Sequence, residues 1–172
     1  LVSSSAASDV YKRQVEVSKY PLFEYPPYEL VLTSKMVEVV QTHNLNLLHV
    51  HYAIPHASAA VNAKRILADA GLTVPVVTTL HGTDITLLGK DASFKPVITH
   101  AINASDVVTT VSQSLKDDTV RLFEVSRDVE VVHNFVCPSH FERPPDVEFR
   151  SQLSPKGAPI LCHASNFRPV KR

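Results

Sequence analysis

Four of the nine histidines of this 172-residue sequence lie in two short polar segments. The segment "HVHYAIPH" (49–56) contains three of them, and "TTLHGTD" (78–84) places His81 next to a glycine, hydroxyl groups and a carboxylate. His49 and His51 alternate, so on a strand they would share a face where one metal ion can bind both. With His81 they suggest, as one hypothesis, a metal-dependent hydrolase. HxH by itself is a weak motif.

The polar residues near these segments also have structural explanations. Thr79, Thr83 and Asp84 can cap the segment that follows them. Asn134 can form a turn, because asparagine tolerates the left-handed region. Tyr52 can belong to the core with only its hydroxyl group at the surface. A functional site therefore requires that several such groups meet at one place.

The elements that would position these residues alternate between strands and helices. Apolar, β-branched runs separated by segments of helical periodicity predict an α/β fold, with a Rossmann-like parallel sheet covered by helices on both faces. The predicted strands of this sheet are 46–52, 75–80, 107–111 and 129–134, and a fifth strand, 159–164, is expected to belong to a second domain. The predicted helices are 28–44, 56–71, 91–105 and 112–123.

Four of the predicted strands end at polar residues. His51 and Tyr52 end the first strand, residues 81–84 follow the second, Ser112 ends the third and Asn134 the fourth. Ligands of parallel sheets bind just past the carboxyl ends of the strands. Polar groups at four corresponding positions therefore predict a binding site at that edge.

The composition restricts the class of protein. The formal net charge is zero, with 17 basic and 17 acidic side chains, so we expect no binding to nucleic acid or to an anionic membrane. No run approaches the ~20 apolar residues of a membrane helix. Cys137 and Cys162 lack CxxC spacing and lie among apolar residues, which predicts two buried thiols rather than a disulfide. We expect a cytoplasmic protein.

The two ends of the sequence differ from its middle. Residues 1–14 are small and polar without periodicity, and we interpret them as a non-native leader or a disordered tail. The sequence stops at Arg172, soon after a predicted strand. We therefore expect a piece of a longer protein.

The order and spacing of five segments resemble the family 4 glycosyltransferases, and among them the enzymes that glycosylate L-malate. These segments are "YPPYELVLTSKM", "LLHVHYAIPHASAA", "VVTTLHGTDITLLGKD", "SDVVTTVSQSL" and "SNFRPVKR". The resemblance covers residues 15–172. It implies retaining transfer of N-acetylglucosamine from UDP-N-acetylglucosamine to L-malate, the reaction that opens bacillithiol biosynthesis, and we expect no cofactor and no metal.

The resemblance also implies two Rossmann-like domains that face each other across a cleft, the GT-B arrangement. Residues 15–150 would form most of the acceptor domain, without its beginning, and residues 151–172 would start the nucleotide-sugar domain. We expect such a piece to be inactive alone, and a non-enzymatic binding module remains an alternative. The sequence leaves the formation of a homo-oligomer open.

Roles for single residues follow from the same resemblance. His81 would be the catalytic residue, which contacts the transferred sugar and stabilises charge. Arg168 and Lys171, assisted by Arg172, would hold the diphosphate, because fixed positive charge stabilises the negative charge that develops there. The residues that would contact the acceptor are Tyr52, Thr79, Thr83 and Asn134, while Asp84 is expected to fix its loop.

Overall fold

The computed structural model describes residues 12–17, 27–87, 89, 91–140, 142, 144 and 146–164. The chain divides into two compact units, Leu1–Asn134 and Phe135–Arg172. The predicted diphosphate residues Arg168, Lys171 and Arg172 lie outside the described residues.

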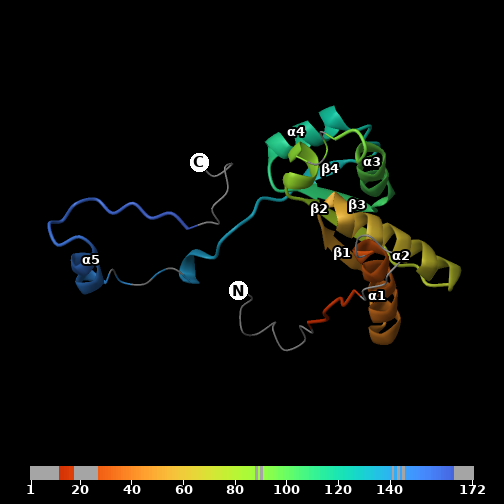
Figure 1. Cartoon of the computed structure of the whole chain (residues 1–172), viewed down its shortest axis with the longest axis horizontal. Coiled ribbons are helices and arrows are strands. Elements are labelled where there is room, and N and C mark those ends of the chain that lie inside the picture. The colour runs from red at the N-terminus through yellow and green to blue at the C-terminus, as the bar shows by residue number, and fades with distance from the viewer. Residues whose placement is uncertain are drawn as a thin grey trace. The chain divides into compact units, whose positions relative to one another are not determined.

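The first unit is built on one four-stranded sheet (Figure 1). Its strands follow chain order, and all three pairs of neighbours are parallel. The predicted Rossmann-like parallel sheet with flanking helices is thereby confirmed, although each strand is shorter than predicted. The strands are β1 (Leu48–His51), β2 (Val76–Leu80), β3 (Val107–Thr110) and β4 (Val129–Val131).

Four helices connect and flank these strands, and local sequence signals define their ends. The glycine at position 71 has a φ of 79° and follows the second helix, as a helix stop does. Pro96 lies in the first turn of the third helix, where its missing N–H costs nothing. The hydroxyl group of Ser112 caps the fourth helix by accepting a hydrogen bond from the Leu115 N–H. These helices are α1 (Tyr28–His43), α2 (Ser58–Asp69), α3 (Lys95–Ala104) and α4 (Gln113–Leu122).

Two apolar clusters hold the helices to the sheet. In the first, Val40 of α1 and Leu67 of α2 pack with buried residues of β1 and β2. In the second, Ile98 and Ile102 of α3 pack with Leu80 and other residues of β2, β3, β4 and α4. Burying a large aliphatic side chain contributes about 1.5–3 kcal/mol, so these clusters fix the ends of the strands in place.

The sheet is covered less completely than predicted. Along β1, Leu48 and Val50 are buried, whereas His49 and His51 are exposed. Val107 of β3, whose side chain points to the same face as these histidines, is 43% exposed. Within the described residues one face of the sheet is therefore open, and the prediction of cover on both faces is wrong there. The alternation of polar and apolar residues in "LHVH" is the pattern of a half-buried strand.

Two short helical turns were not predicted, and both follow strands. The π-helical turn η2 (Ala53–Ala57) continues directly from Tyr52 into α2. The turn η3 (Thr83–Leu87) begins two residues after His81. Both turns keep the chain close to the carboxyl edge of the sheet.

The second unit has no buried core among its described residues. It contains the 3-10 turn η5 (Pro138–His140) and the helix α5 (Val147–Leu153), which was not predicted. Residues 159–164, predicted as a strand, lie in no strand, because a strand requires a hydrogen-bonding partner and no described residue supplies one.

The cysteines also differ from expectation. Cys137 and Cys162 are thiols rather than a disulfide, as predicted, but both are exposed rather than buried. Their apolar neighbours in the sequence are exposed as well, since this unit offers no core to enter. No helix in the described part of the chain is long and apolar enough to cross a bilayer.

Candidate active site

The carboxyl end of β1 leads into an unusual backbone conformation at Tyr52. Its φ is 77°, in the left-handed region that side chains rarely adopt. Its N–H donates a hydrogen bond of 2.9 Å to the Thr79 carbonyl of β2, which extends the ladder of the sheet by one step. The strained residue is thus held at the edge of the sheet, and strain of this kind is common at functional sites.

The loop after β2 is held by the buried carboxylate of Asp84. Only 1% of this residue is exposed. Its Oδ2 accepts a hydrogen bond of 2.8 Å from the Ala53 N–H, and its Oδ1 accepts one of 3.1 Å from the Gly82 N–H. Gly82 has a φ of 113°, which favours glycine. Asp84 therefore joins the loops after β1 and β2, as expected for a residue that fixes its loop.

Three rings meet where these two loops leave the sheet. Nδ1 of His51 lies 2.8 Å from Nε2 of His81, within hydrogen-bonding distance. The ring of Tyr52 also lies next to the ring of His81, with 5.0 Å between the ring centroids. His81 is half-buried and Tyr52 is 37% exposed, so both rings can be reached by a ligand.

A second polar chain crosses the open face of the sheet. Nε2 of His49 lies 2.9 Å from Oγ1 of Thr79, which in turn lies 2.8 Å from Oγ1 of Thr109. A hydroxyl group has one proton to donate and two lone pairs. With two protein partners, Thr79 keeps one hydrogen-bonding position for a ligand.

The electrostatics of this edge favour neutral imidazoles. Burial lowers the pKa of His81, positive charge on His51 lowers it further, and the Asp84 carboxylate opposes both effects in part. Burial and charge on His51 likewise lower the pKa of His49. At neutral pH these rings act as hydrogen-bonding groups rather than as cations.

The predicted catalytic and acceptor residues are not all brought together. Tyr52, Thr79 and His81 meet at the ends of β1 and β2. Thr83 is exposed in η3, and Asn134 is exposed three residues after β4, at the same edge of the sheet. Within the described residues, neither of these two side chains is hydrogen-bonded to the ring cluster.

Sequence reasoning missed the partners that orient the predicted residues. Thr109 was not proposed, His49 was considered only as a metal ligand, and His51 only as a metal ligand or as a polar strand end. The Nδ1 atom of His56 was also missed; it is buried and, among the described residues, has no hydrogen-bond partner. The paired histidines follow from the alignment of β1 with β2, which no local signal in the sequence reveals.

The arrangement does not support the metal-dependent hydrolase. In the part of the chain that the structure describes, no three histidine, cysteine or acidic residues are placed to hold a metal ion. The Nε2 atom of His49 is directed to a threonine, while His51 and His81 are directed to each other. Zinc ligands would instead converge on one point about 2.0–2.1 Å from each nitrogen.

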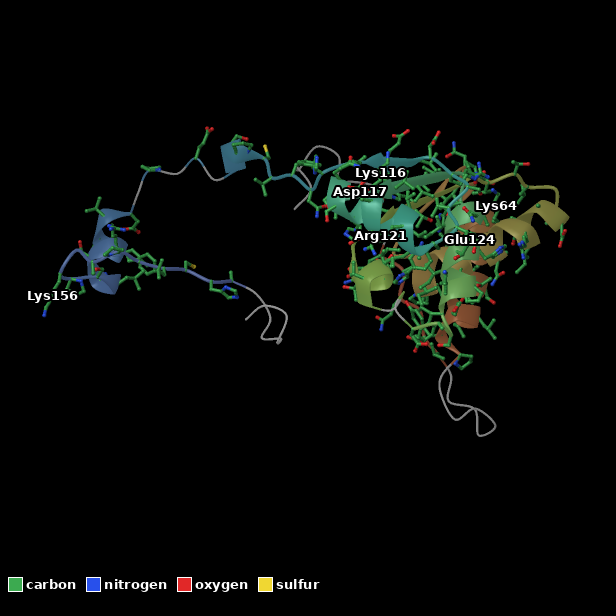
Figure 2. All side chains as sticks on the ribbon, turned by 90° about the horizontal axis from the view of Figure 1, so that it is seen from above. Lys64, Lys116, Asp117, Arg121, Glu124 and Lys156 are labelled. Carbon is green, nitrogen blue, oxygen red and sulfur yellow. The ribbon has the colours of Figure 1, made fainter. Side chains whose placement is uncertain are left out.

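Three of the basic side chains labelled in Figure 2 belong to helices, namely Lys64, Lys116 and Arg121. Lys64 of α2 forms an ion pair with Asp106, and Arg121 of α4 forms one with Asp118. Lys116 lies in the first turn of α4, the helix that begins just after the carboxyl end of β3. The ring cluster itself is polar, which suits a ligand that presents hydroxyl groups.

Comparisons with known proteins agree with a site for a ligand that presents hydroxyl groups. The model of Glycosyltransferase Family 4 matches residues 2–140, which include the whole sheet and the ring cluster. N-acetyl-alpha-D-glucosaminyl L-malate synthase of Bacillus anthracis is 45% identical over 165 residues. The match covers 95% of this chain but only 42% of that relative, so the chain spans less than half the length of the relative.

Proposed function

The chain belongs to glycosyltransferase family 4, and from this premise we propose that its protein transfers N-acetylglucosamine from UDP-N-acetylglucosamine to the hydroxyl group of L-malate. The observation that carries the proposal is the 45% identity, over 95% of this chain, to a relative named for that product. Retention of the sugar's configuration and a place at the start of bacillithiol biosynthesis belong to the same proposal.

Sugar transfer requires a stabilised leaving group, an oriented acceptor and a site without bulk water. In the proposal, His81 contacts the transferred sugar. Its neutral ring offers a hydrogen bond to a sugar hydroxyl group and polar stabilisation of the charge that develops during transfer. The Asp84 carboxylate already accepts two backbone hydrogen bonds, so we assign it to the loop and not to proton transfer.

The acceptor would bind beside this ring. Tyr52 and Thr79 are the proposed malate contacts, with Thr83 and Asn134 further along the edge. The single open position on the Thr79 hydroxyl group suits one oxygen of the acceptor. Malate carries two carboxylates and requires a cation, for which we propose Lys116 of α4 or Arg168.

The diphosphate would be held by the basic end of the sequence. Arg168 and Lys171, with Arg172, supply fixed positive charge for it in the proposal. Residues 151–172 would belong to a nucleotide-sugar domain, and residues 15–150 to the acceptor domain.

The test is a chimera in which this chain replaces the matching segment of the Bacillus anthracis relative. We expect release of UDP that depends on both UDP-N-acetylglucosamine and L-malate. Succinate, which lacks the hydroxyl group, is the matched control and should not support release. A folded chimera that releases UDP without any dependence on malate would refute the acceptor but not the family.

A binding experiment on the chain itself complements the chimera. Calorimetric titration with L-malate and with UDP, performed separately, measures which half of the proposed site these residues supply. We expect heat of binding for malate and little for UDP. Binding of neither ligand by a folded chain would remove the support for malate contacts at Tyr52 and Thr79.

A further inference from the structure

The two histidines of β1 occupy equivalent positions relative to β2. His51 pairs with Thr79 in the sheet register, yet its ring reaches diagonally to His81, two residues further along. His49 pairs with Val77 and reaches in the same way to Thr79. His49 therefore contacts Thr79 of β2 and His51 contacts His81 just after β2, two residues that we place in the substrate site.

A short contact between two imidazole nitrogens restricts where the protons lie. At 2.8 Å, Nδ1 of His51 and Nε2 of His81 form a hydrogen bond only if one of them carries a proton and the other does not. Two bare nitrogens would repel through their lone pairs, and two N–H groups would repel through their protons. The tautomers of the two rings are thus coupled.

The direction of this hydrogen bond follows from the preference of neutral histidine for a proton on Nε2. If His81 donates from Nε2 to Nδ1 of His51, both rings adopt the preferred tautomer. The reverse direction would place the proton of both rings on Nδ1. The first arrangement also leaves Nδ1 of His81 with a lone pair, and no described residue bonds to that atom.

We propose that His51 is a positioning residue: it accepts the Nε2 proton of His81, fixes the orientation of that ring and leaves Nδ1 of His81 as the acceptor for a sugar hydroxyl group. The last part rests on the proposed function, whereas the hydrogen bond itself does not. The His81 ring is enclosed on two sides, since the rings of His51 and Tyr52 each lie 5.0 Å from it. The His51 ring is in turn stacked on His49 at 5.0 Å.

The decisive experiment is nuclear magnetic resonance on the chain labelled with ¹⁵N-histidine, without any substrate. Long-range ¹H–¹⁵N spectra report which nitrogen of His81 carries the proton, and a ¹⁵N–¹⁵N coupling across the hydrogen bond identifies its partner. We expect a protonated Nε2 on His81, a bare Nδ1, and a coupling to Nδ1 of His51.

Three variants separate positioning from general disturbance. His51→Leu should abolish the coupling, speed exchange of the His81 Nε2 proton with water at least about ten-fold, and shift both His81 nitrogens toward averaged tautomers. His51→Asn, whose Oδ1 atom can occupy the place of Nδ1, should restore a slowly exchanging proton. His49→Leu removes a histidine from the same exposed face and should leave the His81 signals unchanged. Both positions are exposed, so the variants are expected to fold.

The outcomes are distinguishable from those of the proposed function. A His81 spectrum that is the same in the wild type and in His51→Leu would overturn the inference, and so would a proton on Nδ1 of His81. If the spectra change as expected but the chimera transfers no sugar to malate, the proposed function fails and the hydrogen-bond assignment stands.

Discussion

Polar side chains lie at both ends of the parallel strands: at the amino edge, where the strands begin, and at the carboxyl edge, where they end. The two groups differ in their hydrogen-bond partners. At the amino edge, Oδ2 of Asp106 accepts a hydrogen bond of 2.7 Å from the Val76 N–H and one of 2.6 Å from Lys64. At the carboxyl edge, the ring nitrogens of His51 and His81 contact each other, and Nδ1 of His81 bonds to no described residue. The first arrangement joins β2, β3 and α2, whereas the second leaves a polar atom available.

This comparison teaches that exposure alone does not identify a functional side chain. Asp106 and His51 are both exposed, yet only Asp106 bonds to a backbone N–H that would otherwise lack a partner. A polar side chain that completes the backbone hydrogen bonding is part of the fold. One that bonds only to another side chain is not required by the backbone, and its remaining polar atoms can bind a ligand. Asp84 lies at the carboxyl edge but belongs to the first class.

The largest expected effect is that of replacing His81. If turnover did not change, the proposed functional difference between the carboxyl edge and the amino edge would be refuted. In the chimera, His81→Ala should lower turnover about 10²–10³-fold, the usual cost of losing one preorganised polar contact in an active site. Malate binding should change little, because we assign His81 to the sugar. The melting temperature should stay close to that of the parent, since strand-end residues contribute little core packing.

The control for this measurement is Lys171→Ala, which should weaken binding of the UDP-sugar and turnover together. The diphosphate is charged both before and during its departure, so a cation that holds it acts on both steps. A His81→Ala chimera with undiminished turnover and a markedly lower melting temperature would show that His81 is structural.

The second prediction tests whether Asp84 stabilises the fold, like Asp106, although it lies at the carboxyl edge of the sheet. Asp84→Asn replaces one carboxylate oxygen with an NH₂ group that faces a backbone N–H, so one of the two buried hydrogen bonds is lost. We expect the free energy of unfolding to fall by about 1.5–3 kcal/mol, as for a lost hydrogen bond to a charged group. Urea denaturation of the chain measures it.

Asp117→Asn, at an exposed position of α4, is the matched control and should change stability by less than about 0.5 kcal/mol. Equal stabilities for the two variants would mean that the loops after β1 and β2 do not depend on the Asp84 carboxylate.

Much of the fold could be predicted because its signals are local. Apolar runs located all four strands of the sheet. Gly71 and Pro96 marked helix ends through their backbone preferences, and Ser112 marked one through its hydroxyl group. The open face was missed although the alternation in "LHVH" indicates it. The predicted strand at 159–164 failed because pairing depends on a partner strand, which an apolar run does not supply by itself.

The candidate site was predicted less completely, because its contacts are not local. Strand ends and residue types identified Tyr52 and His81 as neighbours of one edge, and the family resemblance added Thr79. The partners of Thr79 and His81 lie 30 residues away and depend on the register of β1 against β2. A shift of that register by one residue would turn both histidines to the other face.

A smaller effect is expected at the amino edge. Asp106→Asn should lower the free energy of unfolding by about 1 kcal/mol, because the side chain is partly exposed and its ion pair with Lys64 is screened. Burial raises the pKa of Asp106, but hydrogen bonds from Lys64 and the Val76 N–H, with the charges of Lys64 and Arg127, outweigh it and lower the pKa.

Since this carboxyl titrates at a lower pH in the folded chain, its stabilising contribution is present above the ordinary value of 3.8 and is lost as the pH falls through the folded pKa. The difference in stability between wild type and Asp106→Asn should therefore shrink in strong acid. A Lys64→Met variant should lose less stability than Asp106→Asn, because it keeps the hydrogen bond between Asp106 and the Val76 N–H.

The smallest effect separates the two edges by the pH at which each titrates. His49 and His81 have a lowered pKa in the folded chain, first because they are partly buried and second because of charge on His51. The unfolded chain therefore takes up protons first as the pH falls below the ordinary value of 6.5, so stability is complete above that value and declines below it.

His51→Leu removes the shared charge and should raise the pKa of both remaining rings toward 6.5, which proton resonances of the rings measure in a pH titration. The decline in stability should then become shallower, whereas the acid transition that depends on Asp106 should not move. If His51→Leu left both histidine titrations where they were, the charge coupling within the carboxyl edge would be refuted, and burial alone would account for the lowered values.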